Sequence, residues 1–262
     1  MPGDPVMTTG LVFTFCLSGV VSLTLNDLYP CPINSITTSD DQLLYRNDDG
    51  YSEVINFTFP YYNSTQSLTY VNTNGDITFK FPLSWTHPPV ISANTHVQIA
   101  PFWADVDIIR YGQIWYKQSS TTYLLNRAES EVQQAFPDLR NFHPSSVLTV
   151  TWNKVPYHGG PNDEVFIIEN TFQVVLTTNG VQSFVMFHYL KLDWADNAWV
   201  GFNAGDGVTN YTIEGSPSDD IVNLVTKSNV GVPGKFLFRV DGYDIKFPYR
   251  NITASYTTGM NM

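Results

Sequence analysis

The sequence has few cysteines and little charge. Only two of its 262 residues are cysteine, Cys16 and Cys31, so a framework of several disulfides is excluded and the fold must depend on its apolar core. Charged residues make up 14% of the chain, and 13 Lys and Arg stand against 24 Asp and Glu, a formal net charge of -11. A basic surface for nucleic acid or anionic lipid is therefore not expected.

The chain also lacks the short motifs of common enzyme classes. It contains no G-x-S-x-G, H-E-x-x-H, G-x-G-x-x-G or G-x-x-x-x-G-K-[ST] pattern. The five histidines show no metal-ligand spacing, so most of them are interpreted as ordinary loop or surface residues: His87, His96, His143, His158 and His188. We therefore expect a protein that is not an enzyme and needs no cofactor.

Long apolar runs are missing except near the start. Leu11 to Leu25 reads LVFTFCLSGVVSLTL without a charge, which predicts a secretion signal over residues 1–22, cleaved after Ser22. A buried N-terminal strand is the alternative. Every later apolar stretch is shorter than the roughly 18 residues that span a bilayer, so we expect a secreted chain without a membrane span. Cys16 would leave with the signal, and Cys31 would either bridge to another chain, giving a dimer, or lie buried.

The remaining sequence is typical of β-structure. Hydrophobic residues make up 43% and aromatic residues 15% of the chain. Alternating apolar residues flank Asn74-Gly75 and Asn179-Gly180, which predicts two hairpins with type I′ turns. Helical spacing and the following Pro137 predict one amphipathic helix near 124–136. Further strands are expected at 53–59, 98–106, 113–117, 147–154, 199–203 and 235–240.

We therefore predict a mainly β fold, a single β-sandwich or partly closed barrel with that one helix. Residues 23–242 would form one all-β domain, and residues 243–262 a polar C-terminal tail. Four sequons predict N-glycosylation of the exported chain: Asn56, Asn63, Asn210 and Asn251.

Two acidic residues are the sharpest candidates for chemistry. On a strand, Asp105 and Asp107 would share a face about 7 Å apart, a separation that suits paired glycosidase carboxylates or calcium ligands. The interpretation that we favour is that they cap a strand end and accept from turn amides. The glycine-rich segment WVGFNAGDGVTNYTIEGS (199–216) lacks the side-chain oxygens of a calcium loop and the lysine of a phosphate loop, which predicts a turn.

Tryptophan supplies an alternative function, because exposed indole rings can stack on sugars. Trp103 and Trp152 are placed on strands and are expected in the core. Trp194 and Trp199 flank the polar turn ADNA and are the predicted exposed aromatics of a carbohydrate-binding module.

Several long blocks in a fixed order resemble the NIDO, or nidogen-like, extracellular domain family. They are IAPFWADVD (99–107), LTVTWNKVPYHGG (148–160), NTFQVVLTTNGVQSFVMFHY (170–189), VGFNAGDG (200–207) and SNVGVPGKFLFRVDG (228–242). LYPC (28–31), RNDDG (46–50) and YVNTNGDITF (70–79) resemble the segment that precedes this domain, most of all in alpha-tectorin-type proteins. The resemblance implies a non-catalytic module of extracellular-matrix or cell-surface glycoproteins that takes part in cell–matrix adhesion or matrix assembly through protein–protein contacts.

Overall fold

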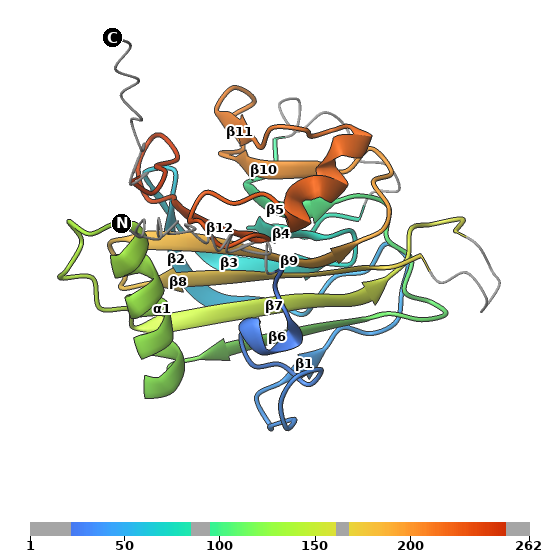
Figure 1. Cartoon of the computed structure of the whole chain (residues 1–262), viewed down its shortest axis with the longest axis horizontal. Helices are drawn as coiled ribbons and strands as arrows, with labels where there is room; N and C mark the ends of the chain where they lie inside the picture. Colours follow the sequence, from blue (N-terminus) through green and yellow to red (C-terminus); the bar gives the residue numbers. More distant parts are fainter. Residues whose placement is uncertain (1–21, 85–94, 161–167, 250–262) are drawn as a thin grey trace, which may run out of the picture.

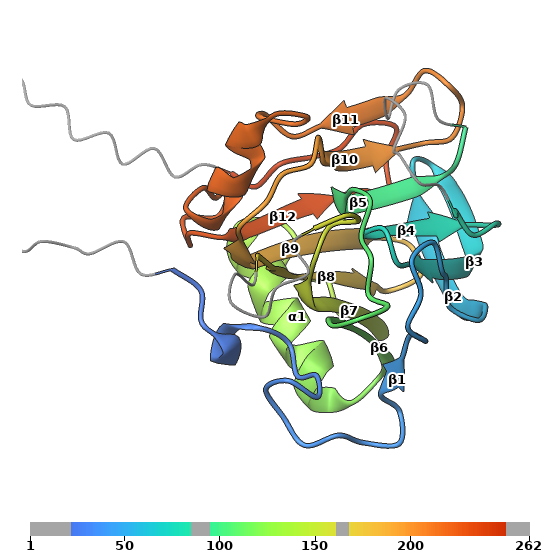
Figure 2. The ribbon, with the colours of Figure 1, turned by 90° about the vertical axis from the view of Figure 1, so that its right-hand side faces the viewer.

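The computed structural model describes residues 22–84, 95–160 and 168–249, which form two antiparallel sheets packed face to face (Figures 1 and 2). Neither sheet closes on itself. The mainly β prediction is confirmed, with the sandwich as its form. The predicted signal (1–22, except Ser22) and Asn251 lie outside the described residues.

The first sheet, sheet A, has six strands. In spatial order they are β1 (Gln42–Leu43), β6 (Gln113–Ser119), β7 (Ser146–Val155), β8 (Asn170–Thr178), β9 (Ser183–Leu192) and β12 (Lys235–Arg239). The predicted hairpin at Asn179-Gly180 joins β8 to β9, but its turn is not type I′. Thr178 pairs with Ser183 across a four-residue loop in which Gly180 alone has positive φ. Asn179 stays in ordinary backbone space and accepts with its side chain from the amides of Val181 and Gln182.

The second sheet, sheet B, also has six strands. In spatial order they are β11 (Asn210–Thr212), β10 (Trp199–Asn203), β5 (Gln98–Trp103), β4 (Asp76–Phe79), β3 (Ser64–Asn72) and β2 (Ile55–Tyr61). Asn74-Gly75 joins β3 to β4 as predicted, but through a three-residue loop, because Asn72 pairs with Asp76. The two-residue type I′ geometry occurs instead at Tyr62 and Asn63, with φ of 44° and 54°, in a β2–β3 hairpin that the sequence patterns did not reveal.

The core lies between the two sheets and is rich in aromatic side chains. Trp152 on β7 stacks on Phe172 of β8 with ring centroids 5.0 Å apart, and its indole nitrogen donates to the carbonyl of Asn72 in sheet B at 3.3 Å. Tyr189 on β9 donates to the carbonyl of Pro101 on β5 at 2.7 Å. Buried polar tips that reach across the interface satisfy their hydrogen bonds and fix how the sheets stack. Trp103 is also buried, on the other face of sheet B, so the predicted burial of both indoles is confirmed.

A helix and the N-terminal segment cover the outer face of sheet A. Helix α1 (Thr122–Ala135) crosses one end of the strands (Figure 1), close to the predicted 124–136. Its buried residues recur at helical spacing and pack on β7, β8 and β9: Leu124, Ala128, Val132 and Ala135. The N-terminal segment begins with a 3₁₀ helix (Leu25–Asp27) and is held to α1 by Arg127, which lies 4.0 Å from the ring centroid of Tyr29 and donates to the carbonyl of Leu28.

The C-terminal part of the described chain folds back onto the sandwich. A second 3₁₀ helix (Asp219–Val225) packs beside β9 before β12. After β12, Lys246 forms an isolated bridge with Arg239, and Ile245 is only 8% exposed. The hydroxyl of Tyr249 donates to Asp138 at 3.2 Å. Packing against the domain therefore continues to residue 249, beyond the predicted start of the tail at 243.

Candidate functional site at the loop end

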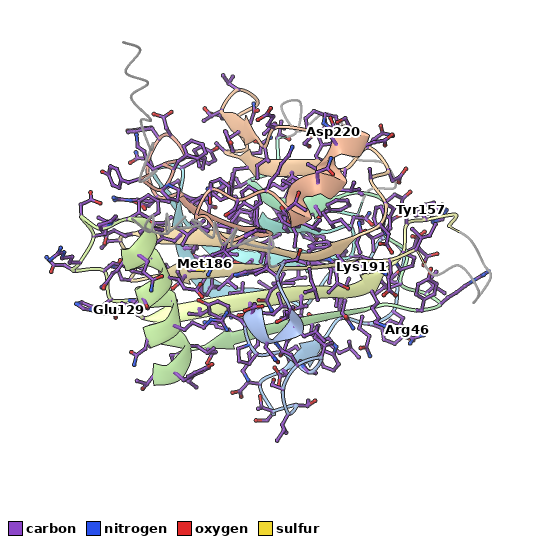
Figure 3. The ribbon with its side chains drawn as sticks, in the orientation of Figure 1. Arg46, Glu129, Tyr157, Met186, Lys191 and Asp220 are labelled. Carbon is purple, nitrogen blue, oxygen red and sulfur yellow. The ribbon has the colours of Figure 1, made fainter. Side chains whose placement is uncertain are left out.

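Three segments from distant parts of the sequence meet at one end of the sandwich. They are residues 44–51, 105–111 and 156–160, called here the loop end. Backbone hydrogen bonds join them, from Ile108 to the carbonyl of Asn47 at 3.2 Å and from His158 to the carbonyl of Asp105 at 2.8 Å. Figure 3 shows Arg46 and Tyr157 together at this end and Glu129 of α1 at the other. The motifs RNDDG, ADVD and PYHGG thus form one surface.

The Asn74-Gly75 turn is hydrogen-bonded to the chain at this surface and positions it. The carbonyl of Asn74 accepts from the amide of Ala104 at 3.0 Å, and its side-chain oxygen accepts from the amide of Val106 at 2.9 Å. Its side-chain nitrogen donates to Oδ1 of Asp49 at 2.8 Å. One buried asparagine therefore holds two of the three segments in register. The sequence motif predicted a hairpin, and the structure adds an anchoring role for it.

Two carboxylates and one imidazole come together at the loop end. Nδ1 of His158 lies 3.0 Å from Oδ2 of Asp48. Ligand atoms of these two residues and of Asp107 all lie within 4.8 Å of one another. The hydrogen bond to Asp48 raises the pKa of His158 above its usual value. Burial raises the pKa of Asp48, although the bond to His158 opposes this. Both shifts have local physical causes.

The structure brings Asp107 together with Asp48 and His158, and not with Asp105 as predicted. Asp105 and Asp107 both follow the end of β5 instead of lying on it, and only Asp107 joins the carboxylate–imidazole group. Asp105 is 4% exposed, and Asp107 accepts from the amide of Ile109 at 2.8 Å. The favoured interpretation, a turn-capping aspartate, therefore holds for Asp107. The second carboxylate of the group comes from Asp48, which is too distant in sequence for any spacing rule to find.

The chemistry of this group differs from the calcium site considered from the sequence. Two carboxylates with an imidazole are ligand types found around Zn²⁺, whereas Ca²⁺ takes sets made only of oxygen. In the described part of the chain, three side chains of these ligand types converge at the loop end: Asp48, Asp107 and His158. Beside them lies a hollow of about 260 Å³, lined by Asp107, Arg110, Tyr111, Pro156, Tyr157, His158, Gly159 and Gly160.

A larger hollow of about 530 Å³ lies elsewhere, between α1 and the 228–232 loop. Two of its charged lining residues pair with each other, Lys235 with Glu131 at 3.0 Å. Glu131 also accepts from Arg127 and from the hydroxyl of Tyr29. These charges are occupied in holding the N-terminal segment, so we place the candidate site at the loop end.

The predicted exposure of Trp194 is wrong. Its side chain is 6% exposed, packs edge-on against Phe102 with centroids 5.2 Å apart, and donates from its indole nitrogen to the carbonyl of Val155 at 3.0 Å. Trp199 is half-buried against Trp103 and the small cluster on the outer face of sheet B. The pair does not form an open sugar-stacking platform. The polar turn ADNA between the two tryptophans suggested exposed rings, but both rings pack against the protein.

The other predicted positions are distributed over the sandwich. The glycine-rich segment forms the β10–β11 turn, where Asp206 accepts from the amides of Val208 and Thr209, as expected of a turn. Cys31 is a free thiol within the N-terminal segment, 4% exposed, and burial raises its pKa. This environment matches the buried alternative, and a Cys31-linked dimer stays a prediction.

With this geometry in view, comparison with known proteins places the chain in a family. Residues 67–242 match the nidogen-like domain, NIDO, so the chain belongs to the nidogen-like domain family. It is 34% identical over 216 residues to alpha-tectorin of Gallus gallus and 33% identical over 198 residues to Nidogen of Drosophila melanogaster. These matches cover 76% and 69% of this chain but 10% and 14% of the relatives.

The chain therefore spans about a tenth of the length of the alpha-tectorins that it matches. Nidogen-1 of Mus musculus is 30% identical over 204 residues, which cover 69% of this chain and 16% of that protein. No solved structure shows significant similarity to the chain. Among the described residues, no helix combines the length and apolar character needed to cross a membrane.

Proposed function

We propose that the chain is a secreted extracellular-matrix glycoprotein module that mediates cell–matrix adhesion or matrix assembly through protein–protein contacts, without catalysis. Membership of the nidogen-like family and the similarity to alpha-tectorin and nidogens support this proposal. The predicted secretion signal and sequons are consistent with it. The partner would be another matrix or cell-surface glycoprotein.

The composition of the loop end is the observation that carries the proposal. Tyr45 is 86% exposed, and Ile109 and Tyr51 are 56% and 51% exposed. The same three segments also carry charged or titratable side chains: Arg46, Asp48, Asp107, Arg110 and His158. Tyrosine and arginine are among the residue types enriched at protein interfaces. The three segments are bonded to one another and two of them to Asn74, so the surface is ordered before a partner binds, which lowers the entropy cost of association.

Capture of matrix glycoproteins tests the proposal. The secreted chain is immobilised and exposed to solubilised extracellular matrix, and the bound proteins are quantified by mass spectrometry. Tyr45→Ala is expected to reduce capture of a specific partner at least tenfold, since a central tyrosine can contribute more than about 1.4 kcal/mol to binding.

Tyr123 supplies a matched control. It is a tyrosine of similar exposure, 66%, but it lies on α1, away from the loop end. Tyr123→Ala should leave capture unchanged. Equal capture by wild type and Tyr45→Ala would show that the loop end is not the binding surface. If the wild type captured no more matrix protein than an unrelated β-sandwich does, the proposed adhesion function would be wrong.

A further inference from the structure

Three of the four sequons lie on the edges of the same sheet. Sheet B ends in β2 on one side and in β11 on the other. Asn56 lies within β2, Asn63 in the turn that follows β2, and Asn210 begins β11. The distribution along the sequence gave no sign of this, because Asn56 and Asn210 are more than 150 residues apart.

The β2 edge combines exposure with an aggregation-prone sequence. Val54 to Phe59 reads VINFTF, a window without a charge, and Pro60 follows it within β2. Phe57 and Phe59 point into the core, whereas Asn56 and Thr58 are exposed on the outer face. Uncharged, apolar windows of this kind on an edge strand are templates for pairing with another chain. The sequon places its acceptor in the middle of the window.

The other two acceptors are accessible in different ways. Asn63 is exposed in the type I′ turn. Asn210 is partly exposed on β11, opposite Asn203 of β10, and its side-chain nitrogen donates to the carbonyl of Val208 at 3.0 Å. A glycosylated asparagine keeps one N–H, so this hydrogen bond is compatible with modification.

We propose that N-glycans on Asn56, Asn63 and Asn210 cover both edges of sheet B and block edge-to-edge association of the protein. In sheet A, features of the polypeptide itself protect the edges from pairing with another chain. Its strand β1 has only two residues, and Lys246 bridges to Arg239 beside β12. Short edge strands and covering segments are recognised ways to protect an edge, and a bulky polar glycan serves the same purpose.

The modification is a group transfer in the secretory pathway. The side-chain nitrogen of asparagine forms a bond to the anomeric carbon of the first N-acetylglucosamine of a lipid-pyrophosphate-linked oligosaccharide. The bond from that carbon to the pyrophosphate oxygen breaks, the lipid pyrophosphate leaves, and the amide nitrogen loses one proton. The N-x-[ST] sequon supplies the acceptor and its hydroxyl.

Two of the three sites also lie away from the loop end. The hydroxyl of Tyr61, beside the Asn63 turn, donates to the carbonyl of Gln98 and accepts from the amide of Asn203. Asn63 and Asn210 therefore lie at the Gln98 end of β5, whereas the loop end follows its Trp103 end. No sequon falls within residues 44–51, 105–111 or 156–160. The inference concerns edge protection and holds whether or not the loop end binds a partner.

Two substitutions at one exposed position test the proposal in the full chain secreted from mammalian cells. Thr58→Val and Thr58→Lys both remove the Asn56 sequon, but only the lysine returns a protective charge to the edge. Intact mass should fall by one glycan in both variants. In sedimentation velocity, Thr58→Val should form associated species that increase with concentration, at least fivefold above wild type, whereas Thr58→Lys should sediment like wild type.

Thr65→Val and Thr212→Val report the other two sites in the same way, each by the loss of one glycan mass. Trimming of the folded wild-type glycans to a single N-acetylglucosamine by an endoglycosidase avoids any effect of substitution on folding, and should also increase association. An unchanged mass in Thr58→Val, or equal sedimentation of wild type, Thr58→Val and trimmed protein, would overturn the proposal. Association of Thr58→Lys equal to that of Thr58→Val would show that the edge is not the surface involved.

Discussion

Nδ1 of His158 lies 3.0 Å from Oδ2 of Asp48, and this contact ties the 156–160 segment to the 44–51 segment. The bond raises the pKa of His158, so its stabilising contribution is complete below the unfolded value near 6.5 and is lost as pH rises through the higher folded value. Burial raises the pKa of Asp48, which also favours the fold at lower pH.

The unfolding temperature should therefore fall between about pH 6 and pH 8 by more in the wild type than in His158→Asn. Because the imidazole is 53% exposed, solvent screens the interaction and the difference should be small. Thermal unfolding across this range, with a chelator present, measures it. In a His158→Asn background, Asp48→Asn should not alter the slope above pH 6.5. A steeper slope in His158→Asn than in wild type would contradict the assigned interaction.

A second pH effect comes from Asp76, which is fully buried on β4. Burial raises its pKa from 3.8 to about 7, although the hydrogen bonds that its Oδ2 accepts from Asn72 and Gln98 lower the pKa. Its Oδ1 lacks a hydrogen-bond partner. A carboxyl whose folded pKa is raised loses stability as pH rises from the unfolded value through the folded one. The wild type should lose on the order of 2–3 kcal/mol between pH 5 and pH 8 from this group.

Asp76→Asn keeps the shape of the neutral acid and removes the ionisation. The variant should resemble the wild type near pH 5 and be more stable at pH 8, which denaturant unfolding at both pH values measures. If Asp76→Asn were as pH-sensitive as the wild type over this range, the buried carboxyl would not be the source.

Trp194→Ala should reduce stability and not sugar binding. The substitution removes an indole that packs against Phe102 and Tyr157 and leaves the carbonyl of Val155 without its donor. Core truncations of this size cost about 3–5 kcal/mol. Trp199→Ala, at a half-buried position, should cost less. A glycan array with both variants checks the point: a specific loss of sugar binding by a folded Trp194→Ala protein would restore the carbohydrate alternative.

Regular alternation made the strands predictable, and spacing made α1 predictable. The hairpins at Asn74-Gly75 and Asn179-Gly180 were located correctly because these dipeptides tolerate positive φ. Their loop lengths were not predictable, since pairing of Asn72 with Asp76 and of Thr178 with Ser183 depends on packing across the sheets. Tyr62-Asn63 forms a turn without any turn signal in the sequence. The amides of Tyr62 and Asn63 donate to the carbonyls of Val240 and Asp241, and these tertiary contacts hold the tyrosine at φ 44°.

The loop end was less accessible to sequence reasoning than the strands. Asp107 was singled out, but Asp48 and His158 had no local pattern that marked them. Their approach depends on the order of strands in two sheets and on the buried side chain of Asn74. Each of the three segments resembles a block of the family. The order of the blocks along the sequence does not specify which loops lie at the same end of a sandwich.

The two Asn-Gly turns allow a last test of the anchoring role, because their glycines have similar backbone angles and different surroundings. Gly75 has φ of 80°, and a Cβ placed there would lie 1.9 Å from the carbonyl oxygen of Phe102. Gly180 has φ of 88°, but a Cβ there would have no atom within 4 Å. Positive φ alone costs a non-glycine residue about 1–3 kcal/mol.

Gly180→Ala should therefore destabilise the protein by about 1 kcal/mol, whereas Gly75→Ala should cost more than about 3 kcal/mol or prevent secretion, since backbone atoms must also move. Denaturant unfolding of the secreted variants measures the difference. Because Phe102 leads directly into the 105–111 segment, any folded Gly75→Ala protein should also show increased hydrogen exchange at Ala104 and Val106, whose amides bond to Asn74. Equal destabilisation by the two substitutions, with unchanged exchange at these amides, would show that Asn74-Gly75 is an ordinary turn and that the loop end is held in place by other contacts.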